Sequence, residues 1–225
     1  MDTETYISIL QSQLEKAKNQ SNAIPMKKYM KEHFEYLGVK SPERKLILAE
    51  FLKEHGLPHI SALPLVIKKL WDLPYREYQY FAMAIAEKSI KKVNNDFLPT
   101  IEYMILQKSW WDTVDYVAGS IAGGYFKRFP EFIPDCTNNW SASNDMWLNR
   151  SAILYQLKYG KNTNKDHLAN YILPHTESKE FFIQKAIGWS LRQYSKTDPE
   201  WVREFISTQP LAPLSVREGL KWLNK

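Results

Sequence analysis

The sequence predicts an all-α fold, arranged as an α-solenoid of stacked helical pairs. The alternation of apolar and polar residues that marks β-strands is almost absent, and apolar residues instead recur three and four positions apart. Pro, Gly or Asn interrupts these segments, and Ser, Thr or Asp precedes the next one. From these signals we expect about a dozen helices of roughly 10 to 18 residues.

Capping signals place the first helix boundaries. Ser41 is expected to cap a helix that begins with Pro42, because the first helical position needs no backbone N–H donor. Gly56, followed closely by a proline, is expected to end that helix.

Four further helix starts follow along the chain. Ser109 and Asp112 match the Ser-x-x-Asp form of the capping box, which predicts that a helix begins immediately after the serine. We expect Ser143 and Ser178 to open two more helices, and Asp198, followed by a proline, to open another.

A charged residue recurs early in every second predicted helix, at intervals of about 32 to 39 residues. A helical-pair repeat of this length is typical of a HEAT-type solenoid, in which the second helix of each pair lines the concave surface. No linker interrupts the repeat, so we expect residues 1–225 to form one domain. The recurring positions are Arg44, Arg76, Asp115, Arg150, Lys185 and Arg217.

The basic members of this set would form a ladder along a concave basic groove. The alternative is that each base bonds to a neighbouring helix end, and Arg44, Arg76 and Arg217, taken singly, fit this alternative better. Asp115 is the exception in the series. A carboxylate weakens the binding of a polyanion, so its presence in such a groove requires another explanation.

Composition sets broad limits on the class of protein. The chain is 44% hydrophobic and 24% charged, as in an ordinary globular protein, and its net charge of +5 mildly favours a polyanionic partner. A polar beginning and the lack of any run of about 18 apolar residues predict a cytoplasmic protein without membrane association. The single cysteine, Cys136, excludes an internal disulfide. The histidines form no ligand pattern, so we expect neither a metal nor a cofactor.

The helix expected after Ser109 carries two Trp–Asp pairs. Asp112 lies in the first turn, where a carboxylate meets free N–H groups, so we interpret it as structural. One stripe, which begins at Trp110, is apolar and is expected to pack inward. The adjacent stripe places Trp111 four residues before Asp115 and continues with small side chains that are expected to leave space. The alternative is that this pair is only a contact on the helix surface.

Two later helices point to the same chemistry. Lys185, Trp189 and Arg192 fall on one helical face, so a tryptophan stands between two cations. Such a ring usually belongs to the core beneath extended basic side chains, but the pattern also suits stacking on a nucleotide. Arg150 and Lys158 lie two turns apart on the helix between, with Trp147 expected in the core. Near the N-terminus, Tyr29 follows two lysines.

At this point the sequence resembles a known family. The segments SWWDTVD (109–115), WLNRSAILYQLKY (147–159), KEFFIQKAIGWSLRQY (179–194) and KSPERK (40–45) are similar to the AlkD family of DNA alkylation-repair glycosylases. The resemblance covers nearly the whole chain and implies a HEAT-like solenoid that grips duplex DNA and excises N3- and N7-alkylated purines.

The resemblance also implies roles for individual residues. Asp115 corresponds to the catalytic aspartate, and Trp111 and Trp189 to the two cleft tryptophans. Arg150 and Tyr29 correspond to the cleft arginine and the N-terminal cleft tyrosine. The remaining residues expected to contact DNA are Ser41, Arg44, Arg76, Lys158, Lys185 and Arg192.

The chemistry of an alkylated purine agrees with a single carboxylate. Glycosidic cleavage normally takes two carboxyl groups, one of which protonates the leaving group. A purine alkylated at N3 or N7 is already cationic, so Asp115 would only have to stabilise the sugar cation and orient water. We therefore expect a monomeric DNA glycosylase acting on alkylated double-stranded DNA. The alternatives are a non-catalytic solenoid that binds damaged DNA and a scaffold for an acidic protein.

Overall fold

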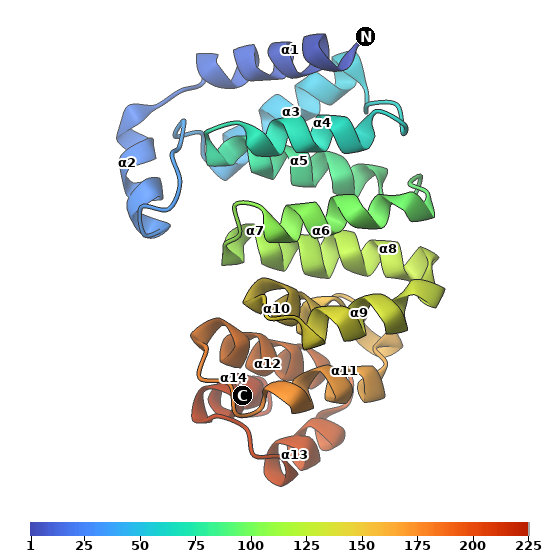
Figure 1. Cartoon of the computed structure of the whole chain (residues 1–225). Coiled ribbons are helices and arrows are strands. Elements are labelled where there is room, and N and C mark those ends of the chain that lie inside the picture. The colour runs from blue at the N-terminus through green and yellow to red at the C-terminus, as the bar shows by residue number, and fades with distance from the viewer. Residues whose placement is uncertain (225) are drawn as a thin grey trace. The chain divides into compact units, whose positions relative to one another are not determined.

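The computed structural model describes residues 1–224 and is built from helices (Figure 1). No β-strand is present in this part of the chain, where the nearest feature is an isolated bridge between Glu35 and Tyr75. The α-helices are α1 (Thr3–Lys16), α2 (Gln20–Tyr29), α3 (Ser41–His55), α4 (Leu63–Asp72), α5 (Arg76–Ser89), α6 (Leu98–Leu106), α7 (Trp111–Tyr116), α8 (Gly123–Arg128), α9 (Ile133–Ala142), α10 (Met146–Leu154), α11 (Lys165–Ile172), α12 (Phe181–Tyr194), α13 (Pro199–Thr208) and α14 (Pro213–Leu220). A π-helical turn, η2 (Val117–Ala122), joins α7 to α8. Short 3-10 helices lie at Asn95–Phe97, Pro130–Phe132, Gly160–Asn162 and Leu173–His175.

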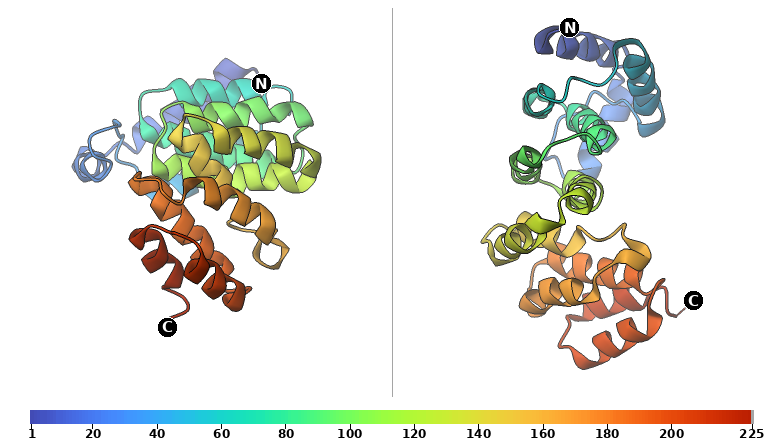
Figure 2. Two further views of the ribbon diagram at one scale, coloured as in Figure 1. Left: turned by 60° about the horizontal axis from the view of Figure 1, so that its bottom comes forward. Right: turned by 90° about the vertical axis from the view of Figure 1, so that its right-hand side faces the viewer.

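Contacts between residues divide the chain into two units, Met1–Tyr103 and the segment from Met104 onward. In the second unit α7 packs on α10, α10 on α12, and α12 on α14, with α9 and α11 against α10 (Figure 2). Stacking of every second helix in this way is the local packing of an α-solenoid. The predicted fold class, an all-α solenoid, is therefore confirmed. The single domain, the HEAT-like subtype and the continuous basic groove stay predictions.

In the first unit, a buried pair on α5 fixes the segment that leads into α3. The carboxylate of Glu77 accepts hydrogen bonds from the backbone N–H groups of Leu37, Gly38 and Val39, at 2.9 to 3.1 Å. Beside it, the Arg76 guanidinium carbon lies 3.7 Å from the centre of the Phe34 ring. The hydrogen bonds to Glu77 satisfy backbone donors that would otherwise be buried without partners.

The structure corrects several predicted helix starts. Ser109 does not cap α7: its hydroxyl donates backwards to the Ile105 carbonyl at 2.6 Å, and the extended residue Trp110 precedes the helix. Ser41 is the first residue of α3 instead of its cap. Ser143 and Ser178 each lie two residues before the observed cap, where their hydroxyls accept a backbone N–H.

Two predicted boundaries are confirmed. The Asp198 side chain accepts the Trp201 N–H at 3.1 Å, with Pro199 as the first residue of α13. Gly56 ends α3 with a φ of 72°, a left-handed conformation that favours glycine.

The predicted faces of the 110–122 segment are partly confirmed. Val114, Val117 and Ile121 are buried as expected. The small residues that follow Asp115 on its stripe, Ala118 and Ala122, do not leave space, however, because both are fully buried. Next to them, α8 closely approaches the chain that follows α10. A Cβ atom on Gly123 would lie 2.5 Å from the Tyr155 carbonyl oxygen.

The contact between α12 and α14 is equally close, and it predicts a difference between two helical glycines. A Cβ on Gly188 would lie 2.4 Å from the Glu218 Cβ and 2.8 Å from the Ser215 carbonyl oxygen. Gly188→Ala should therefore lower the free energy of unfolding by about 1–3 kcal/mol, although alanine is the better helix former. Urea denaturation measures this change.

Gly119→Ala is the matched control. A Cβ there would lie 3.6 Å from the Leu157 Cβ and 3.8 Å from the Leu154 carbonyl oxygen, which are ordinary van der Waals contacts. This variant should be as stable as the parent or more stable. Equal losses in both variants would show that the two helix contacts do not differ as described.

Candidate functional site

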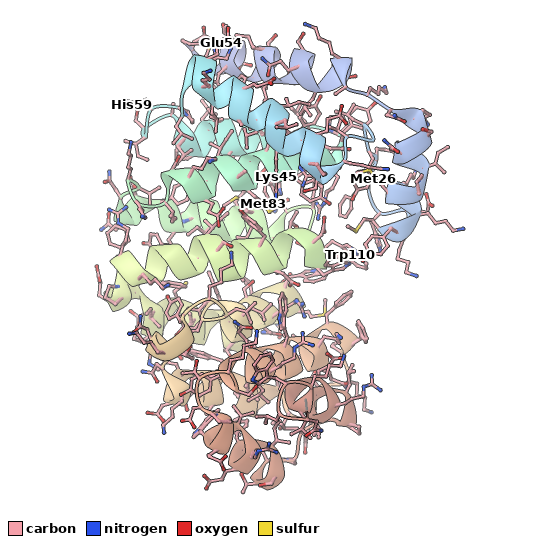
Figure 3. All side chains as sticks on the ribbon, turned by 180° about the vertical axis from the view of Figure 1, so that it is seen from behind. Met26, Lys45, Glu54, His59, Met83 and Trp110 are labelled. Carbon is pink, nitrogen blue, oxygen red and sulfur yellow. The ribbon has the colours of Figure 1, made fainter. Side chains whose placement is uncertain are left out.

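Asp115 lies on α7, one turn after Trp111 and two residues before the π-helical turn. Its carboxylate is largely buried, with 14% of the side chain exposed. Figure 3 labels Trp110 at the end of the helix where α7 begins. The second turn of a short helix thus carries a carboxylate close to the surface without leaving it freely solvated.

Arg150 of α10 holds this carboxylate in a two-point contact. Its Nε donates to Asp115 Oδ1 at 2.6 Å and one terminal nitrogen donates to Oδ2 at 2.9 Å. The other terminal nitrogen donates to the Phe182 carbonyl oxygen at the start of α12. Only 4% of the arginine side chain is exposed. The planar guanidinium therefore fixes the orientation of the carboxylate and joins α7, α10 and α12.

The electrostatic state of Asp115 reflects two opposing effects. Burial raises the pKa of its carboxyl above the ordinary value of 3.8, and Arg150 opposes that rise by hydrogen bonding and by its charge. The charge of nearby Asp112 acts in the same direction as burial. The carboxyl is therefore more readily protonated than an exposed aspartate, while Arg150 stabilises its ionised form.

An aromatic cluster supports the ion pair from one side. The ring of Trp110 lies 5.9 Å from Trp147 and 5.2 Å from Phe182, and the last two are 5.1 Å apart, measured between ring centres. These residues lie at the beginnings of α7, α10 and α12. The cluster thus fixes the relative position of the three helices that carry the predicted site residues.

Lys158 contacts the segment formed by α7 and η2, on the C-terminal side of Asp115. Its Nζ donates to Ser120 Oγ on η2 and lies 5.5 Å from the centre of the Tyr116 ring. Arg150 and Lys158 therefore both face the α7–η2 segment. The expected spacing of two turns along one helix is wrong, because α10 ends at Leu154 and Lys158 lies in the turn that follows it. Turns of π-helix are often found at functional sites, and this one contains the Ser120 hydroxyl that Lys158 binds.

The basic face of α12 depends on a residue that the sequence reasoning missed. Lys185 and Arg192 both bind the carboxylate of Glu218 on α14, at 2.9 and 3.3 Å, and Lys221 binds it at 2.7 Å. The hydrogen bond from Lys221 and the charges around it lower the pKa of Glu218 to about 2. Trp189 lies half-buried on the same helix. No local pattern marks Glu218, because only the packing of α14 on α12 brings it to these cations.

The predicted residues of the first unit fall into two groups. Tyr29, Ser41 and Arg44 line one cavity of about 320 Å³, and Arg44 stacks 4.1 Å from the centre of the Tyr80 ring. Tyr29 is strongly exposed. Arg76 is fully buried against Phe34, which favours the alternative that it is an internal support over the predicted DNA contact.

The protein is thus an all-α solenoid with a largely buried carboxylate beside several basic side chains. Comparison with known proteins shows the family to which it belongs. A family model described as DNA alkylation repair enzyme matches residues 10–223. The chain belongs to this family, and its role lies in the repair of alkylated DNA.

A solved structure agrees with this assignment. It is described as a predicted DNA alkylation repair enzyme from Enterococcus faecalis and is 36% identical, with a TM-score of 0.86. The match covers 92% of this chain and 97% of that one. No curated protein matches the chain. Among the described residues, no helix has both the length and the apolar character needed to cross a membrane.

The buried ion pair predicts a strong coupling between its two partners. Arg150→Ala should lower the free energy of unfolding by about 3–5 kcal/mol, because it leaves the Asp115 carboxylate buried without its partner. The double variant with Asp115→Ala should lose clearly less than the sum of the two single variants. Urea denaturation of all four proteins measures the coupling. Additive losses would show that the pair contributes nothing beyond its separate side chains.

Proposed function

We propose that the protein is a monofunctional DNA glycosylase that hydrolyses the N-glycosidic bond of N3- and N7-alkylated purines in duplex DNA and leaves an abasic site. The observation that carries this proposal is the single carboxylate of Asp115, held in a fixed orientation by buried Arg150. The aromatic and basic residues of α12 and the family membership support it.

The mechanism follows from the charge of the lesion. An alkylated purine cation leaves without being protonated, so the enzyme has to stabilise the sugar cation that develops as the bond breaks. A carboxylate about 4 Å from that cation, at an effective dielectric constant near 20, contributes up to about 4 kcal/mol. This corresponds to roughly three decades of rate. The same carboxylate can orient the attacking water.

The tryptophans supply a second contribution. The faces of Trp111 and Trp189 would attract a cationic lesion nucleotide by about 0.5 to 2 kcal/mol each. Lys158, Lys185 and Arg192 would bind phosphates and make the affinity for DNA fall with salt. Because Arg150 already binds Asp115, contact of Arg150 with a phosphate would use donor positions that the ion pair leaves open.

A second candidate is a non-catalytic protein that binds damaged DNA. The observation that favours it is that Arg150 already neutralises Asp115, so the pair could serve only to join helices. Incubating the protein with methylated duplex and measuring released purine separates the two functions. Release of 3-methyladenine or 7-methylguanine supports the glycosylase, and binding without release supports the second candidate.

The two aspartates of α7 should differ in their contribution to excision. Asp115→Asn preserves shape but removes the charge, so single-turnover excision should fall by about two to three decades. Asp112→Asn, the matched control one turn earlier, should keep most of its activity and lose no more than about 1 kcal/mol of stability. Melting temperatures and duplex affinities are measured for both variants. Normal excision by Asp115→Asn would refute the catalytic assignment.

The raised pKa of Asp115 predicts the pH dependence of excision. The mechanism needs the ionised carboxylate, so the rate should fall in acid with a midpoint above 3.8. Arg150→Gln should move this midpoint further upward, because Arg150 is the group that lowers the pKa. Single-turnover rates between about pH 4 and pH 8, corrected for spontaneous base loss, measure the shift. An unchanged midpoint in Arg150→Gln would show that another group titrates.

A further inference from the structure

The second unit contains a cavity that Trp189 and Arg192 line, but that neither Trp111 nor Asp115 reaches. It has a volume of about 480 Å³, within the usual range for small-ligand sites. It lies between α12 and the chain around the end of α14. Its lining residues are Trp189, Arg192, Gln193, Lys196, Lys221 and Trp222.

This cavity carries more positive charge than its internal contacts use. Three cations line it, Arg192, Lys196 and Lys221. Buried Glu218 binds Arg192 and Lys221 together with Lys185, a fourth cation that lies outside the lining. A single carboxylate neutralises one of the four. The remaining positive charge favours an anion.

The packing of α12 on α14 explains only part of this arrangement. Glu218 and Lys185 join the two helices where Gly188 allows close approach. Lys221 keeps 48% of its side chain exposed, and Lys196 is also at the surface. The contact between the two helices does not require the exposed cations Lys196 and Lys221.

The aromatic side chains narrow the class of anion. Trp222 is 45% exposed, and the Lys196 Nζ lies 5.3 Å from the centre of its ring. Trp189 lines the same cavity from α12. An exposed tryptophan beside several cations is the combination with which proteins bind single-stranded nucleic acid: bases stack on the rings, and phosphates contact the cations.

We propose that this cavity binds one unpaired nucleotide of a DNA strand. The phosphate contacts Arg192 and Lys221, and the base stacks on Trp222. The nucleotide must be unpaired because a base inside a regular duplex has no free face to offer an aromatic ring. The inference rests on the proposed function in that DNA is the partner, and it adds a second contact in the unit that contains Asp115.

Two variants of residues that line the cavity test the proposal, with labelled single-stranded dT12 as the probe. Trp222→Ala should weaken binding about tenfold, because it removes one stacking platform. Lys221→Gln should reduce the slope of log affinity against log salt by about 0.7, the value for one phosphate of a single strand. Fluorescence anisotropy at several salt concentrations measures both effects.

Two variants of exposed residues in the same unit, neither of which lines the cavity, serve as controls. Leu173→Ala removes an exposed apolar side chain, and Lys161→Gln removes one positive charge. Both should bind dT12 like the parent. The proposal is overturned if the parent does not bind dT12, or if Trp222→Ala and Lys221→Gln behave like these controls.

Two further measurements separate the possible outcomes. Free dTMP should compete only weakly, because the cavity is assigned to a nucleotide within a strand; competition as strong as that of unlabelled dT12 would overturn that assignment. Excision from methylated duplex is measured on the same protein. Excision without dT12 binding refutes only this inference, and dT12 binding with the predicted losses but without excision refutes only the glycosylase proposal.

Discussion

The two-point contact between Asp115 and Arg150 is the interaction on which the rest of the site depends. It holds a carboxylate in one orientation, links α7 to α10, and through the Phe182 carbonyl extends to α12. A charge that is partly removed from water needs such a partner, since an unpaired one would be expensive. The same contact gives the site its chemical character, because it balances burial against ionisation. Structure and reactivity therefore draw on a single pair of side chains.

The sequence predicted those parts of the site that follow from the spacing of residues along a helix. Steps of three and four residues placed Asp115 with Trp111, and Lys185 with Trp189 and Arg192, on common faces. The repeat placed Arg150 on the neighbouring helix, where the structure joins it to Asp115. These relations depend only on helical geometry and on the order of the helices along the chain.

The rest depended on contacts that no local pattern contains. Serine is a residue type that often caps helices, but the Ser109 hydroxyl donates instead to the Ile105 carbonyl oxygen of the preceding helix. Arg76 resembles the other bases in spacing, and only packing against Phe34 makes it internal. Glu218 was missed altogether, since an isolated glutamate on a late helix carries no signal until α14 packs against α12. Residues that act through distant partners are thus the ones that sequence reasoning overlooks.

The π-helical turn after Asp115 has a consequence for how this segment tolerates change in length. A π turn contains about one residue more than a turn of α-helix, and each residue of an α-helix advances by about 100°. Loss of a single residue from η2 would restore regular α-helix and leave α7 and α8 in place, because the extra residue is taken up within the turn, but it would shift the side chains of the turn itself, Ser120 included. Asp115 would keep Arg150, while Lys158 would lose its present partner. Relatives that are one residue shorter in this turn would therefore share the ion pair and differ in the surface next to it.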